Sequence, residues 1–158
     1  MGLDMYLSRK FYVKNWDFTE TKDKFSIIIT QGKEPSTIPI DKITTITTEE
    51  MYWRKSNAIH KWFVTNVQDG NDDCNEYFVP KEQLRELLSL IDRVVKDHSL
   101  APELLPTSEG FFFGDNSYDD YYFSDLEDTH KTLYVLLLDD KIKQNNMKDG
   151  EFYYQSSW

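Results

Sequence analysis

Both ends of the chain have the residue pattern of a β-strand, and this feature limits the possible folds most strongly. Near the N-terminus, Leu3, Met5 and Leu7 alternate with Asp4 and other residues, as in a strand with one buried face. Near the C-terminus, the sequence EFYYQSSW is rich in aromatic residues that favour strands, and it follows an Asp-Gly pair typical of a turn. Chain ends usually fray unless they are held in place. We therefore predict that the two terminal strands lie side by side in one sheet.

The segments between these ends alternate between strand and helix patterns. Runs of β-branched residues predict strands at residues 25–31 and 43–49. A short strand is predicted within residues 74–79. Helical spacing of apolar residues predicts three helices, which start at residues 48–50, near Pro80 and at Ser117.

This order of elements predicts an α+β fold. We expect a single domain over residues 1–158, which is long enough to bury a core. Its sheet should be mainly antiparallel and include both terminal strands, with about three helices packed on it.

Residues 52–63, YWRKSNAIHKWF, have an unusual polar face when they are wound as a helix. One face is apolar and suits a core. Trp53, Asn57 and His60 fall together on the opposite face within about 60° of arc, where a surface helix normally carries Lys or Glu. Trp53 offers a stacking surface, Asn57 and His60 offer hydrogen bonds, and Arg54 beside them offers positive charge.

These side chains predict a pocket for a small, planar, anionic ligand such as a nucleotide. The terminal strands would complete the pocket with Asp4 and Tyr6 from one strand and Ser156 or Trp158 from the other. The alternative is that the helix is covered on both sides, so that Trp53 belongs to the core and the polar side chains tie down loops. His60 could also serve as a general acid or base, although no second catalytic group has the required spacing.

The formal net charge of -10 limits the classes of partner. A nucleic-acid binder needs a basic surface, and an anionic membrane would repel this chain, so we expect neither partner. A basic protein is a suitable partner, although excess charge can also serve solubility alone. The segment YDDYYFSDLED alternates aromatic and acidic residues. It predicts a protein interface built from Tyr118, Asp119, Asp120 and Tyr121, unless these residues only begin a helix.

The sequence predicts neither a metal site nor a cofactor. Its three histidines are far apart and match no paired-ligand spacing. The segment DGNDDC resembles a calcium loop, but the glycine is misplaced and Pro80 stands where the final glutamate belongs. The single cysteine, Cys74, makes no internal disulfide, and no apolar run is long enough to span a membrane. We therefore expect a cytoplasmic protein.

Several segments together carry a family likeness: MGLDMYL, YWRKSNAIHKWFV, DDCNEYFV, LLPTSEGFFFG, YDDYYFSDLEDT and FYYQSSW. In this order they resemble a family of short, functionally uncharacterised proteins of bacteriophages and prophages. The resemblance covers nearly the whole chain. It implies a phage accessory protein that acts in the cytoplasm of a bacterial host, and by analogy a role against host defences. It implies no catalytic residues.

Three functions follow from these observations. The first is a non-catalytic counter-defence protein that holds the planar anionic ligand. The second is an inhibitor that docks its acidic surface on a host defence protein or a nucleic-acid-binding protein. The third is a small enzyme that acts on a nucleotide through His60. An open site at Trp53, Asn57 and His60 would favour the first or third, whereas sealed side chains beside exposed aromatics at residues 118–128 would favour the second.

Overall fold

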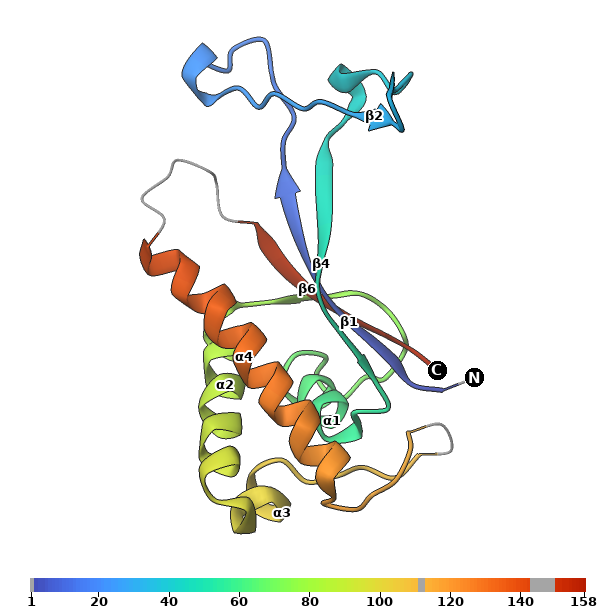
Figure 1. Cartoon of the computed structure of the whole chain (residues 1–158), viewed down its shortest axis with the longest axis vertical. Helices are drawn as coiled ribbons and strands as arrows, with labels where there is room; N and C mark the ends of the chain where they lie inside the picture. Colours follow the sequence, from blue (N-terminus) through green and yellow to red (C-terminus); the bar gives the residue numbers. More distant parts are fainter. Residues whose placement is uncertain (1, 111–112, 143–149) are drawn as a thin grey trace.

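A four-stranded antiparallel sheet forms the centre of the molecule (Figure 1). The structure is a computed structural model that describes residues 2–110, 113–142 and 150–158. The strand order is β4–β1–β6–β5. The strands are β1 (Asp4–Tyr12), β4 (Thr45–Arg54), β5 (Tyr77–Val79) and β6 (Glu151–Ser157). The α+β fold predicted from the sequence is confirmed.

The two terminal strands are direct neighbours, as predicted. β1 and β6 pair antiparallel from Asp4 opposite Ser157 to Lys10 opposite Glu151. Both ends of the chain therefore lie together at one end of the sheet (Figure 1). Residue 149 of the predicted Asp-Gly turn lies outside the described residues.

Strand β4 continues through the residues where a helix was predicted to begin. The start predicted at residues 48–50 is wrong, because this segment pairs with β1 as far as Arg54, which lies opposite Asp4. The helix α1 (Asn57–Asn66) begins only after the chain turns at Lys55, whose φ is 60°. Trp53 therefore lies on a strand, and the helical wheel that placed it beside Asn57 and His60 does not apply to it.

Three further helices complete the body of the protein: α2 (Lys81–Lys96), the short α3 (Ala101–Leu104) and α4 (Asp120–Ile142). α2 carries the predicted apolar face, with Leu84, Leu87, Ile91 and Val94 buried. α4 packs against α2, and its residues at helical spacing enter the same core. These buried residues of α4 are Tyr122, Leu126, Thr129, Leu133 and Leu137.

The first turn of α4 is capped by a residue other than the one predicted. The carboxylate of Asp119 accepts a hydrogen bond from the backbone N–H of Tyr122 at 3.0 Å, which is the usual N-cap contact. Ser117, the predicted cap, donates its own backbone N–H to Asp115 in the preceding loop. The cap therefore lies two residues later than predicted, and the helix starts at Asp120.

One face of the sheet is buried against the helices. Met5 and Leu7 of β1 and Phe152 and Tyr154 of β6 are almost fully buried, while the residues between them are more exposed. This alternation is the period of two seen in the sequence of the terminal strands.

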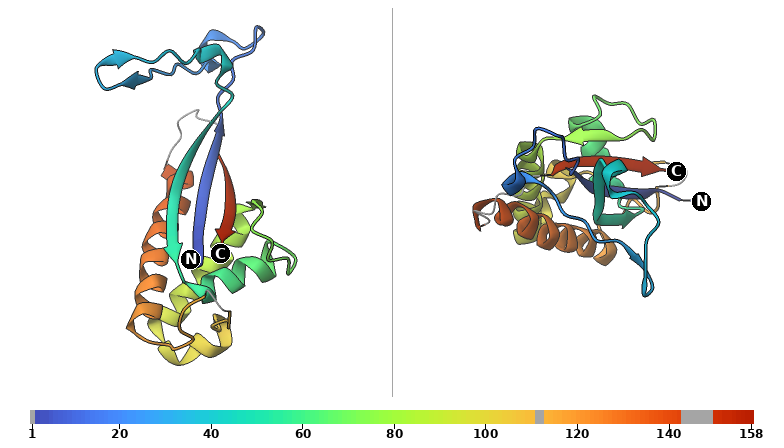
Figure 2. Two further views of the ribbon diagram at one scale, coloured as in Figure 1. Left: turned by 90° about the vertical axis from the view of Figure 1, so that its right-hand side faces the viewer. Right: turned by 90° about the horizontal axis from the view of Figure 1, so that it is seen from above.

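Residues 13–44 form an arm that projects from the far end of the β1–β4 ribbon (Figures 1 and 2). The arm contains the short hairpin of β2 (Thr30–Gln31) and β3 (Glu34–Pro35), together with the 3-10 helices η1 (Thr21–Asp23) and η2 (Ile40–Lys42). A third 3-10 helix, η3 (His98–Leu100), lies in the body. Of the strand predicted at residues 25–31, only the last two residues are β-structure.

Candidate functional site

His60 lies inside the body of the protein rather than on an open surface. Its side chain is 1% exposed, and its two ring nitrogens contact Tyr154 and Asp72. Nδ1 lies 2.8 Å from the hydroxyl of Tyr154, and Nε2 lies 3.0 Å from a carboxylate oxygen of Asp72. Because a carboxylate only accepts, Nε2 donates to Asp72, and in the neutral imidazole Nδ1 then accepts from the hydroxyl of Tyr154. Burial raises the pKa of Tyr154 well above its usual value, which keeps this hydroxyl protonated.

Trp53 is buried as well, and its polar atom already has a partner. Its indole N–H donates to the hydroxyl of Thr129 on α4 at 2.7 Å, and its side chain is 3% exposed. The ring packs at a tilt against Phe63, with 6.0 Å between centroids. No face of this indole is open for stacking on a ligand.

Asn57 fastens a loop over the start of α1. Its side-chain N–H groups donate to the carbonyl oxygens of Phe113 and Asp115, at 3.2 and 2.9 Å. Its side-chain oxygen accepts from the backbone N–H of Ser108 at 3.0 Å. This side chain therefore holds Ser108, Phe113 and Asp115 against the turn between β4 and α1.

The remaining predicted ligand-binding residues lie on two different faces of the sheet. Asp4 and Tyr6 lie on the more exposed face, where Asp4 accepts a hydrogen bond from the hydroxyl of Tyr52. Ser156 lies on the buried face, is 1% exposed, and its hydroxyl has no hydrogen-bond partner among the described residues. The structure does not bring these three residues together around one pocket, so ligand binding by the full set stays a prediction of the sequence.

A pocket of about 300 Å³ opens where β4, α1, Thr107, residues 114–117 and the start of α4 meet. Arg54 and Asn57 from the predicted ligand set line it. Asp119 and Tyr121 from the predicted protein interface also line it. The two predicted sites therefore meet at this pocket, which we call the junction pocket.

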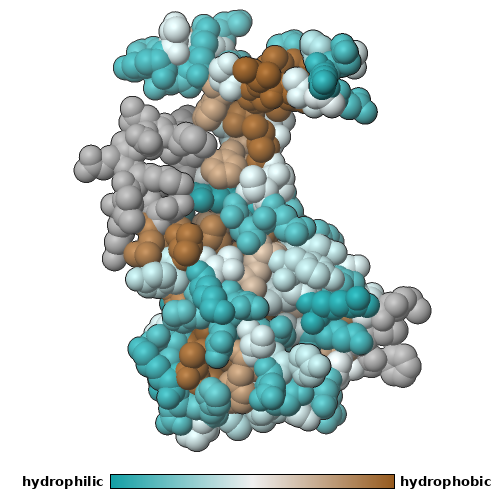
Figure 3. All heavy atoms as spheres, viewed as in Figure 1, coloured by the Kyte–Doolittle hydropathy of each residue, from teal (hydrophilic) through white to brown (hydrophobic). Residues whose placement is uncertain are grey.

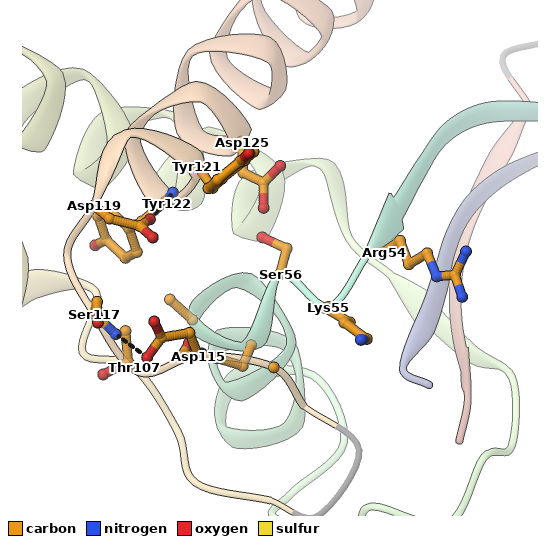
Figure 4. Close-up of a pocket in the computed structure, with 13 residues that line it drawn as sticks. Arg54, Lys55, Ser56, Thr107, Asp115, Ser117, Asp119, Tyr121, Tyr122 and Asp125 are labelled. Carbon is orange, nitrogen blue, oxygen red and sulfur yellow. Dashed lines mark hydrogen bonds between the residues drawn. The ribbon is translucent and has the colours of Figure 1, made fainter. Parts of the chain in front are cut away.

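The inner wall of the junction pocket is acidic. Figure 4 shows the carboxyl groups of Asp119 and Asp125 directed into the space beside Ser56, whereas Arg54 and Lys55 extend away from it. Burial raises the pKa of Asp125, although a hydrogen bond with Ser56 opposes this shift. The charges of Asp119 and Asp128 raise it further. A cation that enters the pocket would relieve this repulsion, whereas an anion would increase it.

A third carboxylate, Asp115, lies at the edge of the same space. The side chain and backbone N–H of Ser117 hydrogen bond to it and lower its pKa, so it stays ionised. With Asp119 and Asp125 it gives the pocket three acidic side chains.

The rim of the junction pocket presents an exposed aromatic side chain. Tyr121 is 83% exposed, and Tyr118 beside it is 37% exposed. Tyr122 also lines the pocket, but it is buried and donates its hydroxyl to the carbonyl oxygen of Leu105 at 2.8 Å. The first turn of α4 is thus anchored by Tyr122, while the preceding residue, Tyr121, faces solvent.

Sequence reasoning missed several residues of this pocket, among them Lys55, Ser56, Asp115 and Asp125. Ser56 and Asp125 are 69 positions apart in the chain, and no periodicity connects them. One local signal was present, since Ser56 directly precedes Asn57-Ala58-Ile59, and serine is a preferred residue just before a helix.

Nothing in the described part of the chain gathers metal ligands. No group of three or more His, Cys, Asp or Glu side chains has the geometry to hold a metal ion among residues 2–110, 113–142 and 150–158. Within the same residues, no helix is long and apolar enough to cross a membrane.

Comparison with protein-family models, with curated proteins and with solved structures finds no match to this chain. The phage family suggested by the sequence motifs therefore stays a prediction.

Proposed function

We propose that this chain is a non-catalytic binding protein whose acidic surface docks on a basic protein. The observation that carries this proposal is the exposed Tyr121 at the rim of a pocket whose carboxylates point inward. In the bacterial context implied by the sequence resemblance, the partner would be a defence protein or a nucleic-acid-binding protein of the host.

The charge around the pocket supports a basic partner. Residues 115–128, DNSYDDYYFSDLED, contain six Asp or Glu and no Lys or Arg. Such a surface attracts a basic protein at long range and repels nucleic acid. The junction pocket then offers carboxylates to one Lys or Arg side chain of the partner.

The aromatic residues supply the apolar part of the interface. Tyrosine is enriched at the centres of protein interfaces, because its ring buries a large area while its hydroxyl can still form hydrogen bonds. Tyr121 is held on a regular helix whose first turn is capped by Asp119 and anchored by Tyr122. It is therefore presented in a fixed position, which lowers the entropy that binding costs.

The same geometry disfavours a planar anionic ligand in this pocket. Such a ligand would approach Asp115, Asp119 and Asp125. The stacking surface of Trp53 and the nitrogens of His60 are already in contact with protein groups. The buried state of these side chains, next to exposed tyrosines on α4, is the arrangement expected for the docking protein.

The test measures the binding of two labelled peptides of equal length, one rich in arginine and one rich in glutamate, by fluorescence anisotropy. The wild type should bind the arginine-rich peptide only, and added salt should weaken this binding. Asp119→Asn keeps a good helix cap while it removes the charge. We expect this variant and Tyr121→Ser each to lower the affinity about tenfold, or about 1.4 kcal/mol.

The matched control is Glu86→Gln, which makes the same charge change at an exposed position of α2. It should leave the affinity nearly unchanged. An equal loss for Glu86→Gln and Asp119→Asn would mean that net charge alone attracts the peptide. Tight binding of a nucleoside triphosphate in the same assay would contradict the proposal and favour the anionic ligand.

A further inference from the structure

The arm of residues 13–44 exposes apolar side chains that its own structure does not cover. Within the arm only Val13 is buried. Phe18 is 83% and Ile28 is 90% exposed, and the space-filling view shows apolar residues gathered where the arm meets the ribbon (Figure 3). The other large apolar side chains exposed on or next to the arm are Tyr12, Trp16, Ile38, Ile40 and Ile46. A patch of this kind usually marks an interaction surface.

The arm also has a hollow of its own. Val13, Phe25, Ile27 and Ile40, with Asn15 and Asp41, line a cavity of about 230 Å³. Asn15 holds one wall in place, since its side chain bonds to both the N–H and the carbonyl oxygen of Phe25 at 2.8 Å. One arm thus carries both protruding apolar groups and a recess, as the self-complementary surface of a two-fold interface requires.

The edge of the sheet continues this surface. β4 is an edge strand, since β1 is its only strand neighbour within the part of the chain that the structure describes. Its first five residues, Thr45–Glu49, are all exposed. An uncovered edge with this pattern can pair with a strand of another chain.

The charge distribution favours a neutral, apolar occupant of this surface. Residues 13–44 contain five Lys and five Asp or Glu, so the arm is neutral. The rest of the chain then holds 13 Lys or Arg and 23 Asp or Glu, so the whole net charge of -10 lies there. A basic partner is drawn to the body, and an acidic partner is repelled by it. A second arm is neutral and apolar in the same way, and because each arm projects from its body (Figure 2), two arms that pack together would keep the two acidic bodies apart.

We propose that the arm is a dimerisation element that packs against the arm of a second copy of this chain. The contact buries the apolar side chains around Phe18 and Ile28 across a two-fold axis. It places the two junction pockets at the far ends of the dimer, where both stay free to bind.

The test is the mass of the protein in solution, measured by sedimentation equilibrium over a range of concentrations. The wild type should approach twice the chain mass of 18.8 kDa. The double variant Phe18→Ser with Ile28→Ser should raise the dimer dissociation constant at least tenfold. Because both side chains are exposed in the monomer, its circular dichroism spectrum should match that of the wild type, and so should its melting temperature at concentrations low enough for both proteins to be monomeric.

Tyr121→Ser is the matched control, because Tyr121 is as exposed as Phe18 but lies on the body. It should leave the dimer unchanged. Added salt should strengthen the dimer, because it screens the repulsion between the acidic bodies. A wild type that stays a monomer would overturn the proposal, and so would equal dissociation by Tyr121→Ser. If the wild type is a monomer that co-floats with phosphatidylcholine vesicles, the arm binds a lipid surface and the dimer proposal is wrong.

Discussion

His60→Ala should destabilise the protein strongly even when no ligand is present. The substitution leaves the hydroxyl of Tyr154 buried without its partner, which costs about 1–3 kcal/mol. It also removes a hydrogen bond to Asp72, which costs about 1 kcal/mol because this carboxylate keeps solvent and the indole of Trp158 as partners. The total is about 3 kcal/mol.

Thermal and urea unfolding measure this effect. For a chain of this length, about 3 kcal/mol corresponds to a fall in the melting temperature of roughly 6–12 °C. The double variant Tyr154→Phe with His60→Ala separates the cost of an unpaired tyrosine hydroxyl from the cost of the packing that His60 loses. Since the double variant has no orphaned hydroxyl, it should be about 1–2 kcal/mol more stable than the two single changes add up to.

The control is His130→Ala, which removes a partly exposed histidine whose Nε2 lies 3.3 Å from a carboxylate oxygen of Asp92. Such a pair contributes at most about 1 kcal/mol, so the melting temperature should fall only slightly. A melting temperature of His60→Ala that equals that of the wild type would refute the reasoning. It would mean that His60 faces solvent, as the hypothesis of a ligand-binding helix face requires.

Three further changes test other parts of the structure. Trp53→Phe removes the indole N–H that donates to Thr129, and urea unfolding should show a loss of about 1–2 kcal/mol, whereas unchanged stability would contradict the buried contact. Deletion of residues 154–158 removes most of a strand that lies between two others, so the product should aggregate, and a soluble product that melts like the wild type would contradict this. Asp125→Asn should raise the melting temperature at pH 7, because burial raises the pKa of this carboxyl and its ionised form destabilises the fold. Since the wild-type carboxyl takes up its proton as the pH falls, the two melting temperatures should converge below the ordinary pKa of 3.8, and a difference that persists there would contradict the assignment.

The regular parts of the fold were predictable because each one shows a single periodicity. The terminal strands alternate with a period of two, and their pairing followed from the need to hold both ends. Helix α2 has apolar residues at helical spacing over its whole length, and this spacing does not fit the period of two of a strand. In these segments local propensity and burial favour the same structure.

The start of α1 was mispredicted because two patterns fit the same residues. The aromatic residues near Trp53 suit a strand paired with β1 as well as the first turn of a helix. Pairing with β1 makes this segment a strand, and a single sequence does not show which strands pair. The turn itself depends on Lys55 in a left-handed conformation, for which lysine gives no signal.

The strand predicted at residues 25–31 was wrong for a different reason. Its β-branched residues have the right propensity, but only Thr30 and Gln31 find a partner strand. Propensity measures how well a residue fits a paired and half-buried surface, and the arm provides little of either.

The position of the junction pocket depends on the turn between β4 and α1, which the sequence did not predict. Gly114, with a φ of 88°, lies so close to the turn that an added Cβ would be 3.1 Å from the side chain of Lys55. Asn57 then fixes the loop that contains Gly114 with three hydrogen bonds. Asp115, at the edge of the acidic wall, is therefore held by the first residue of α1. A partner that binds there meets a surface that is already ordered, so the side chains can contribute to affinity without first paying to fold a loop.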